Sequence, residues 1–276
     1  MVGVTDLIED NATHLAETAA LAAGVVVREL TELPDLDAVY HLYNEIWQPD
    51  PTNPPVTTEL LRAMTKAGNY VSGAFDGDRL VGACVAFFGS PPDVRLHSHV
   101  AGVHASAMGR SVGYALKLHQ RAWAISRGLS AVEWTFDPLV SRNAYFNLSK
   151  LGARPVEYLP DFYGGMRDQI NRGEESDRLL VRWDLRSGPA AGPDLPAVIA
   201  LDRSPEGRPV LGTVDGPDLL VAAPRDIEAL RSSDPAGARQ WRLAIREVLG
   251  TLLTEGARIT GFDRSGWYRV TRKDGR

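Results

Sequence analysis

The chain has 276 residues, of which 44% are hydrophobic, 24% charged and 8% aromatic, and its formal net charge at pH 7 is −5. This length can bury a sizeable core in one large domain or two smaller ones, and the acidic balance argues against a nucleic-acid partner. The longest apolar runs, such as residues 81–88, are too short to cross a bilayer, and the single cysteine, Cys84, excludes an intramolecular disulfide. We therefore expect a cytoplasmic protein that is neither secreted nor membrane-spanning.

Hydrophobic spacing and turn residues predict an alternating series of helices and strands in an α/β (α+β) fold. The predicted elements up to residue 185 are a helix within 1–23, a strand at 25–30, a helix opened by Asp35, a helix from Thr57 or Thr58 to Lys66, a hairpin of 70–75 and 80–88, a strand at 96–103, a helix at 112–127, a strand at 131–136, a helix at 141–151 and a strand at 179–185.

Residues 186–196, rich in Gly, Pro and Ala, predict a linker or long loop. Beyond it we expect strands near Val198 and at 219–222, a helix at about 234–255, and a strand pair around Ile259 and Tyr268. The predicted domains are an N-terminal helix (1–23), a main domain (24–185) and a smaller C-terminal α+β extension (186–276).

The centre of the chain combines a strand, a glycine-bearing loop and a helix. Residues 96–103 lead into Met108-Gly109-Arg110-Ser111-Val112-Gly113-Tyr114-Ala115. Such a loop directs several backbone N–H groups to one point, and the positive end of the helix dipole favours an anion there. The pattern predicts a phosphate site, with an ordinary strand-to-helix turn as the alternative.

The wider pattern resembles the GNAT superfamily of acyl-CoA-dependent N-acyltransferases over residues 25–185. It includes a loop of the form Arg/Gln-x-x-Gly-x-Gly/Ala and a short helix that ends at Lys150-Leu151-Gly152. The resemblance implies a mixed, mostly antiparallel sheet with splayed central strands and flanking helices. It also implies residues that contact the cofactor, namely Ala101 and Val103 beside pantetheine, Arg110, Ser111, Val112, Gly113, Tyr114 and Ala115 around the pyrophosphate, and Asn143, which could equally cap its helix.

Three positions depart from this family pattern. Met108 stands where Arg or Gln is usual, Ser111 replaces a glycine, and Leu148 occupies the place of the family's tyrosine acid. A left-handed conformation at Ser111 would cost on the order of 1 kcal/mol, which does not by itself abolish CoA binding. A second frame, Arg110-x-x-Gly113-x-Ala115, fits the motif literally but starts the helix two residues later; we prefer the first frame.

His97 and His99 stand two apart on a predicted strand, which places them on one face together with Ala101 and Val103. The pattern is similar to that of arylalkylamine N-acetyltransferases, in which a histidine pair takes the amine proton through water. A base that titrates near pH 6.5 suits this task. Half-buried, hydrogen-bonded structural histidines are the alternative.

Aromatic and acidic residues follow the strand at 131–136. Phe136, Asp137 and Tyr163 are candidate substrate contacts, with Asp137 positioned to hold an ammonium group. The alternative, which we favour for Asp137, is that it starts a turn before a proline, and Tyr163 is equally a core residue.

The sequence therefore predicts an N-acyltransferase that passes an acetyl or succinyl group from CoA to a small-molecule amine, such as an amino acid or arylalkylamine. The alternative is a catalytically degenerate module that binds acyl-CoA and has a regulatory or interaction role. Neither a metal nor a membrane is expected to take part, because the histidine pair has no third ligand at metal-binding spacing. A homodimer is left open.

Overall fold

A computed structural model describes residues 4–91, 94–165, 173–187 and 196–272. The chain divides into two compact units, and each is described by itself. The first unit comprises Met1–Glu133 and Asp184–Arg186, and the second comprises Trp134–Trp183 and Ser187–Arg276.

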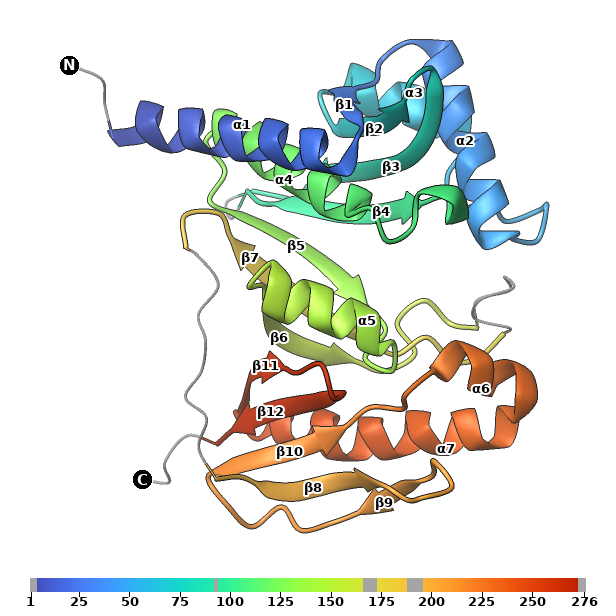
Figure 1. Cartoon of the computed structure of the whole chain (residues 1–276), viewed down its shortest axis with the longest axis vertical. Coiled ribbons are helices and arrows are strands. Elements are labelled where there is room, and N and C mark those ends of the chain that lie inside the picture. The colour runs from blue at the N-terminus through green and yellow to red at the C-terminus, as the bar shows by residue number, and fades with distance from the viewer. Residues whose placement is uncertain (1–3, 92–93, 166–172, 188–195, 273–276) are drawn as a thin grey trace. The chain divides into compact units, whose positions relative to one another are not determined.

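The first unit is built on a mostly antiparallel sheet (Figure 1). Its strands, in spatial order, are β1 (Val26–Glu29), β2 (Tyr70–Asp76), β3 (Arg79–Phe88), β4 (Leu96–Val103) and the beginning of β5 (Ala131–Phe136), which runs parallel to β4. The predicted hairpin is confirmed, because Asp76 pairs with Arg79 across a two-residue turn in which Gly77 has a φ of 59°. That positive φ favours glycine.

Helices cover both faces of this sheet. The four helices are α1 (Val4–Ala23), α2 (Leu33–Trp47), α3 (Thr58–Lys66) and α4 (Val112–Ser126). A Cβ atom on Gly82 of β3 would meet Val112 and Leu116, so α4 packs on that face, and α1 packs on α4. The neighbouring residues of β3, Ala83 and Val85, join the core cluster formed by α2 and α3 on the opposite face.

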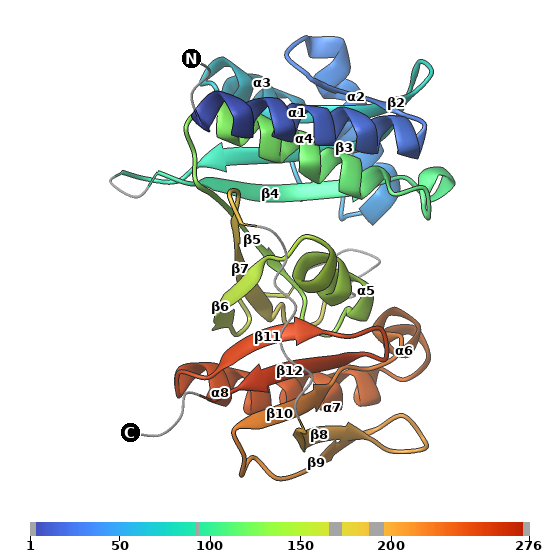
Figure 2. The same ribbon diagram turned by 60° about the vertical axis from the view of Figure 1, so that its left-hand side comes forward.

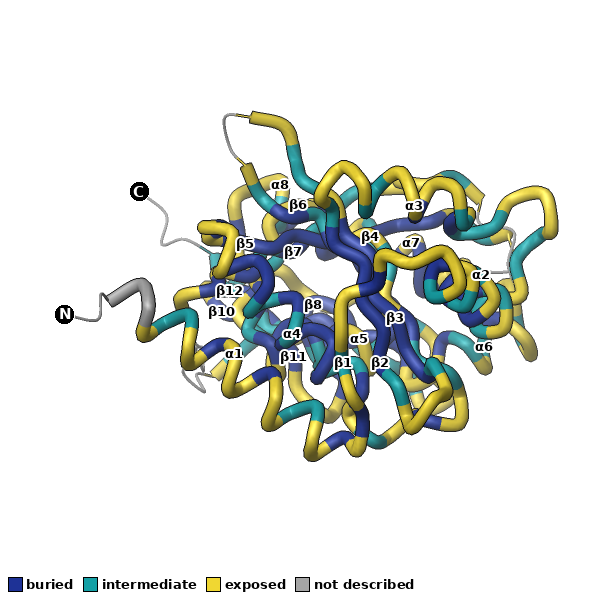
Figure 3. The backbone as a smooth tube through the Cα atoms, turned by 90° about the horizontal axis from the view of Figure 1, so that it is seen from above, coloured by how far each residue is buried: buried dark blue, intermediate teal, exposed yellow. Residues whose placement is uncertain are grey.

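Strands β2 and β3 are the most buried part of this unit (Figure 3). Their small and β-branched side chains suit a sheet covered on both faces. Of the two predicted positions, Thr57 is the one that caps α3, because its hydroxyl accepts a hydrogen bond from the backbone N–H of Leu60. The sheet therefore holds β4 between two helical layers.

The second unit contains the end of β5, followed in the same sheet by β7 (Arg178–Asp184) and β6 (Arg154–Leu159). Helix α5 (Ser141–Ala144) continues as a π-helical turn (Tyr145–Lys150). A separate five-stranded sheet has the order β11-β12-β10-β8-β9, and α7 lies along one of its faces (Figure 2). These strands are β8 (Val198–Arg203), β9 (Pro209–Leu211), β10 (Asp218–Ala222), β11 (Arg258–Phe262) and β12 (Trp267–Thr271).

The C-terminal helices are α6 (Ile227–Ser233), α7 (Pro235–Ile245) and α8 (Thr251–Thr254). A π-helical turn (Arg246–Gly250) joins α7 to α8, which confirms the long helix predicted at 234–255. The side chain of Asp234 caps α7 by accepting a hydrogen bond from the N–H of Gly237.

The mixed, mostly antiparallel architecture is confirmed, but three short elements were not predicted. Strand β6 has only one fully buried residue, so it lacks a clear alternation of apolar and polar residues. Strand β9 has three residues and begins at a proline, and α6 has seven residues. Most of the linker predicted at 186–196 lies outside the described residues.

The two units do not follow the predicted domain boundaries. The division falls inside β5, and the N-terminal helix belongs to the first unit because it packs on α4. Residues 134–183 join the C-terminal extension because β6 packs against β11 and α8. No helix among the described residues is both long enough and apolar enough to cross a membrane.

Candidate functional site

A β-bulge interrupts β4 at His99. Ala86 of β3 pairs with Ser98, whereas the preceding residue, Val85, pairs with Val100, so His99 is the extra residue. A bulge shifts the alternation of side chains along a strand, because two residues oppose one on the partner strand. The alternation of side chains between the two faces of the sheet is therefore broken at His99, and residues before and after it do not share one regular pattern.

Because of this bulge, the prediction that the histidine pair shares one face of β4 with Ala101 and Val103 is wrong. Ser98 contacts α4 through Lys117, yet a Cβ atom on Gly102 would lie 2.6 Å from Trp47 of α2. Ala101 pairs with Cys84, and Val103 approaches Gly113 of α4. His97 therefore does not share a face with Ala101 and Val103, which lie on the α4 side of the sheet.

The structure does bring His97 and His99 together. Their ring centroids lie 6.4 Å apart, and the ring of Phe87 lies 5.0 Å from His97 and 5.8 Å from His99. Burial lowers the pKa of His97 to about 4, with smaller contributions from His99 when it is protonated and from the positive charges of Lys117 and Arg95. Burial also lowers the pKa of His99 below 6.5. Both rings are therefore neutral at pH 7 and can accept a hydrogen bond or a proton.

The parallel ladder between β4 and β5 is short. Their parallel ladder contains only Leu96 with Val132 and His97 with Glu133. From Ser98 to Val103, the only ladder partner of β4 in the described part of the chain is β3. The other edge of β4 therefore presents backbone groups that an extended ligand can pair with.

The loop after β4 ends in an unusual helix start. Ser111 begins α4 in a left-handed conformation, with a φ of 66°, and its side chain makes no capping hydrogen bond. Gly109 also has a positive φ, 80°. Among the backbone hydrogen bonds of the described residues, none uses the N–H groups of residues 109–113 as donors. Together with the helix dipole, these N–H groups make the start of α4 suitable for an anion.

Fewer of the residues predicted to surround the pyrophosphate, 110–115, offer a free backbone N–H group than expected. The N–H groups of Tyr114 and Ala115 both donate to the carbonyl of Ser111, which leaves them engaged within the helix. Val112 and Ala115 also have buried side chains. Helix α4 starts at Val112, as the preferred frame of the motif requires.

The side chain of Arg110 is directed to the protein rather than to the start of α4. Its guanidinium group binds the carboxylate of Asp76 at 2.5 Å and the carbonyls of Ala23 and Gly24 at 3.2 and 3.1 Å. Arg110 therefore ties the loop to the end of α1 and to the β2–β3 hairpin. Its contribution to an anion site is its backbone N–H alone.

A buried polar cluster lies beneath β4, and the sequence analysis did not find it. The ammonium group of Lys117 donates to the hydroxyl of Ser98 at 2.8 Å and to the amide oxygen of Gln120 at 3.1 Å. The amide of Gln120 donates to the sulfur of Cys84 at 3.2 Å. Burial lowers the pKa of Lys117 to about 8 and raises that of the Cys84 thiol. The available signal was the spacing of Lys117 and Gln120, which are three residues apart and so lie on one side of α4.

Asp137, in the second unit, is not open to a substrate ammonium group. Its buried carboxylate accepts hydrogen bonds from Arg242 at 2.7 and 2.8 Å and from Arg231 at 2.6 Å. Burial alone would raise the pKa of this carboxyl, but the two arginines hold it well below its usual range. Asp137 also accepts from the N–H of Leu139, which confirms the alternative that it starts a turn.

The other predicted residues of the second unit differ in exposure. Phe136 is buried in the core. Tyr163 is exposed, and its hydroxyl shares a hydrogen bond of 3.1 Å with the hydroxyl of Thr135. Asn143 is exposed and lies inside α5, whose N-cap is Val140, so Asn143 does not cap the helix. No group of three metal-binding side chains is found among the described residues.

No protein-family model matches the chain, and no curated protein matches it. Solved structures resemble part of it. The ribosomal-protein-S18-alanine N-acetyltransferase of Escherichia coli is 14% identical, with a TM-score of 0.46, over 62% of this chain and 98% of that one. An acetyltransferase of the GNAT family from Streptococcus pneumoniae is 14% identical, with a TM-score of 0.47, over 57% and 98%. The protein yncA of Salmonella typhimurium, solved with acetyl-CoA, is 18% identical, with a TM-score of 0.45, over 62% and 98%.

Proposed function

We propose that the chain is an acyl-CoA-dependent N-acyltransferase that passes an acetyl or succinyl group to the amine of a small molecule. One observation carries the proposal. The unpaired edge of β4, from Ser98 to Val103, leads through one loop to the N–H groups of residues 109–113, which donate to no backbone acceptor in the described residues. A ligand with an extended, amide-containing chain next to a pyrophosphate fits this arrangement, because the chain can pair with the strand edge and the pyrophosphate with the N–H groups.

The residues present fit the two polar parts of an acyl-CoA. Pantetheine would pair with the backbone of Ala101 and Val103, as an added strand does with a sheet edge. The N–H groups of residues 109–113 would hold the pyrophosphate, with the positive end of α4 behind them. The acyl-CoA would supply the activated acyl group. The protein would position it and remove a proton from the acceptor amine.

The histidine pair is proposed to move that proton. An amine is protonated near neutral pH and must lose a proton before it can attack a carbonyl carbon. Because the pKa of His97 is lowered to about 4, its neutral ring can accept a hydrogen bond from a water molecule at neutral pH. We assign proton acceptance to His99, which is the more exposed of the two and lies at the bulge.

Activity measurements test these roles. Release of free CoA from acetyl-CoA or succinyl-CoA, followed with a thiol reagent over a panel of amines, should reveal turnover. His99→Gln should lower kcat/KM by about 10²-fold or more, the range typical of a lost general base. Because the pKa of His99 lies below 6.5, the wild-type rate should be level near neutral pH and fall only on acidification.

Two controls accompany this assay. His41→Gln changes an exposed histidine of α2 and should leave the rate unchanged. A His99→Gln variant that retains the wild-type rate and the same acidic fall would contradict the assignment of His99.

The degenerate-module alternative also has an observation in its favour. Leu148 is buried and has no proton to give, where the resemblance leads one to expect an acid. A thiolate is nevertheless a good leaving group without assistance. CoA binding without turnover on any amine would favour the module over the enzyme.

A further inference from the structure

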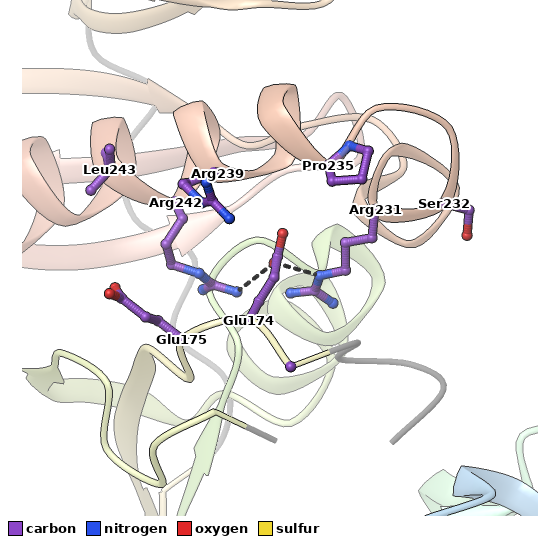
Figure 4. A pocket seen from close by; sticks show the side chains of 9 residues that line it. Glu174, Glu175, Arg231, Ser232, Pro235, Arg239, Arg242 and Leu243 are labelled. Carbon is purple, nitrogen blue, oxygen red and sulfur yellow. Dashed lines mark hydrogen bonds and ion pairs between the residues drawn. The ribbon is translucent and has the colours of Figure 1, made fainter. Parts of the chain in front are cut away.

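The second unit contains a pocket of about 530 Å³ that the proposed acyl transfer does not use. Figure 4 shows its charged lining: Glu174 precedes β7, Arg231 comes from α6, and Arg239 and Arg242 project from α7. This volume is in the range of pockets that hold small molecules.

Two arginines form a fixed, buried wall of the pocket. Arg231 and Arg242 are 2% and 4% exposed, and both bind Asp137. The carboxylate of Glu174 lies between them, 3.0 Å from Arg231 and 4.0 Å from Arg242. In the described part of the chain, Nη1 of Arg231 and Nε of Arg242 are buried without a hydrogen-bond acceptor. Both atoms are closed to solvent, so these two arginines act as a wall of the pocket and not as donors to a ligand.

Arg239 differs from these two because it is exposed and makes no hydrogen bond or ion pair with any described residue. It lies three residues before Arg242 on α7, where like charges repel each other. Among the described residues, the charged side chains in and around the pocket are five arginines and four carboxylates, namely Arg178, Arg231, Arg239, Arg242 and Arg246 with Asp137, Glu174, Glu175 and Asp177. Within this described set one positive charge is in excess, and Arg239 is the arginine without an ion pair to the other members.

The same face of α7 also supplies apolar surface. Pro235 and Leu243 stand four residues before and after Arg239, so all three share one face of the helix. Both line the pocket, and the side chain of Leu243 is 52% exposed. A ligand that places an anionic group on Arg239 would therefore have apolar surface on either side.

We propose that this pocket binds a small monocarboxylate, with its carboxylate on Arg239 and its apolar body against the neighbouring Leu243. A planar carboxylate can accept two parallel hydrogen bonds from one guanidinium group, which a tetrahedral anion without an apolar part matches less well. The excess of a single positive charge is consistent with a monoanion.

Calorimetric titration of the full chain without CoA tests the proposal independently of acyl transfer. The probes are benzoate, its neutral isostere benzamide, and inorganic phosphate. Benzoate should bind, and benzamide and phosphate should each bind about tenfold more weakly or not at all. Arg239→Gln should weaken benzoate binding by about tenfold or more, because it removes the pairing cation. Arg258→Gln, at an exposed position of β11 outside the pocket, makes the same change of charge and should bind benzoate like the wild type.

Four results would overturn the proposal. Absence of benzoate binding, or equal binding of benzamide, would remove the role of the carboxylate. Phosphate binding as tight as that of benzoate would indicate an unspecific anion site. Unchanged binding in Arg239→Gln, with the far-ultraviolet circular dichroism of the wild type, would place the ligand elsewhere.

Discussion

Lys117 is a charged residue in buried surroundings. Its ammonium group is buried between β4 and α4, and its hydrogen-bond partners include the uncharged side chains of Ser98 and Gln120. Because burial disfavours the charged form, the pKa of Lys117 falls from 10.5 to about 8. This residue therefore links the stability of the first unit to pH.

Lys117→Met should remove that link. In the wild type, the unfolded chain holds the Lys117 proton up to about pH 10.5 while the folded chain releases it near pH 8. The free energy of unfolding should therefore rise with pH between these values, by at most about 3 kcal/mol. Urea denaturation at pH 7 and pH 10 should show the variant gaining less than the wild type.

Lys66→Met is the matched control, because Lys66 ends α3 on the surface. It should keep the wild-type dependence on pH. If Lys117→Met and the wild type gain equally between pH 7 and pH 10, Lys117 does not titrate in the folded protein as described.

The buried arginines of the second unit allow a second prediction at this scale. Arg242→Met would leave the Asp137 carboxylate buried with Arg231 alone, which should destabilise the protein by about 3 kcal/mol. Arg142→Met removes an ion pair with Glu228 in which Arg142 is 58% exposed, and it should cost less than about 1 kcal/mol. Equal costs in urea denaturation would contradict the importance assigned to the buried pair.

At the scale of elements, the β-bulge at His99 decides which residues of β4 face α2. It directs Gly102 towards Trp47, so a Cβ atom there would lie 2.6 Å from the indole ring. Gly102→Ala should therefore destabilise the protein by about 1–3 kcal/mol through overpacking. In a Trp47→Leu background the same change should cost clearly less, because the ring is gone.

A double-mutant cycle measures this coupling. The four free energies of unfolding come from the wild type, the two single variants and the double variant. A cost of Gly102→Ala that is the same in both backgrounds would mean that Gly102 does not face Trp47.

Most elements were predictable because their sequence signals are local. The hairpin around Gly77 and the cap at Thr57 depend on neighbouring residues alone. The bulge was not predictable, because His97, His99, Ala101 and Val103 follow the alternation of a regular strand. Its position depends on the register with β3, which the sequence of β4 does not contain.

The candidate site was predictable in part for the same reason. The left-handed start of α4 at Ser111 follows from the local motif. The ion pairs of Arg110 and Asp137 do not follow from local sequence, because their partners lie 34 to 105 positions away. A charged side chain can be recognised as a candidate, but whether another residue already neutralises it depends on the fold.

At the scale of the whole molecule, the chain consists of two compact units with different chemistry. The first contains the open edge of β4 and the available N–H groups at the start of α4. The second contains the pocket lined by Arg231, Arg239 and Arg242 and the buried carboxylate of Asp137. Ligand binding by the two units can therefore be tested separately, acyl-CoA for the first and a monocarboxylate for the second.

Binding of CoA is the measurement that tests the central claim most directly. Calorimetric titration of the full chain with CoA, acetyl-CoA and succinyl-CoA should give micromolar binding. Gly113→Trp, which puts a large side chain on the first turn of α4, should abolish it. Ser126→Trp, at the exposed opposite end of the same helix, should bind like the wild type. No binding of any of the three ligands to the folded protein, or binding that survives Gly113→Trp, would contradict the account.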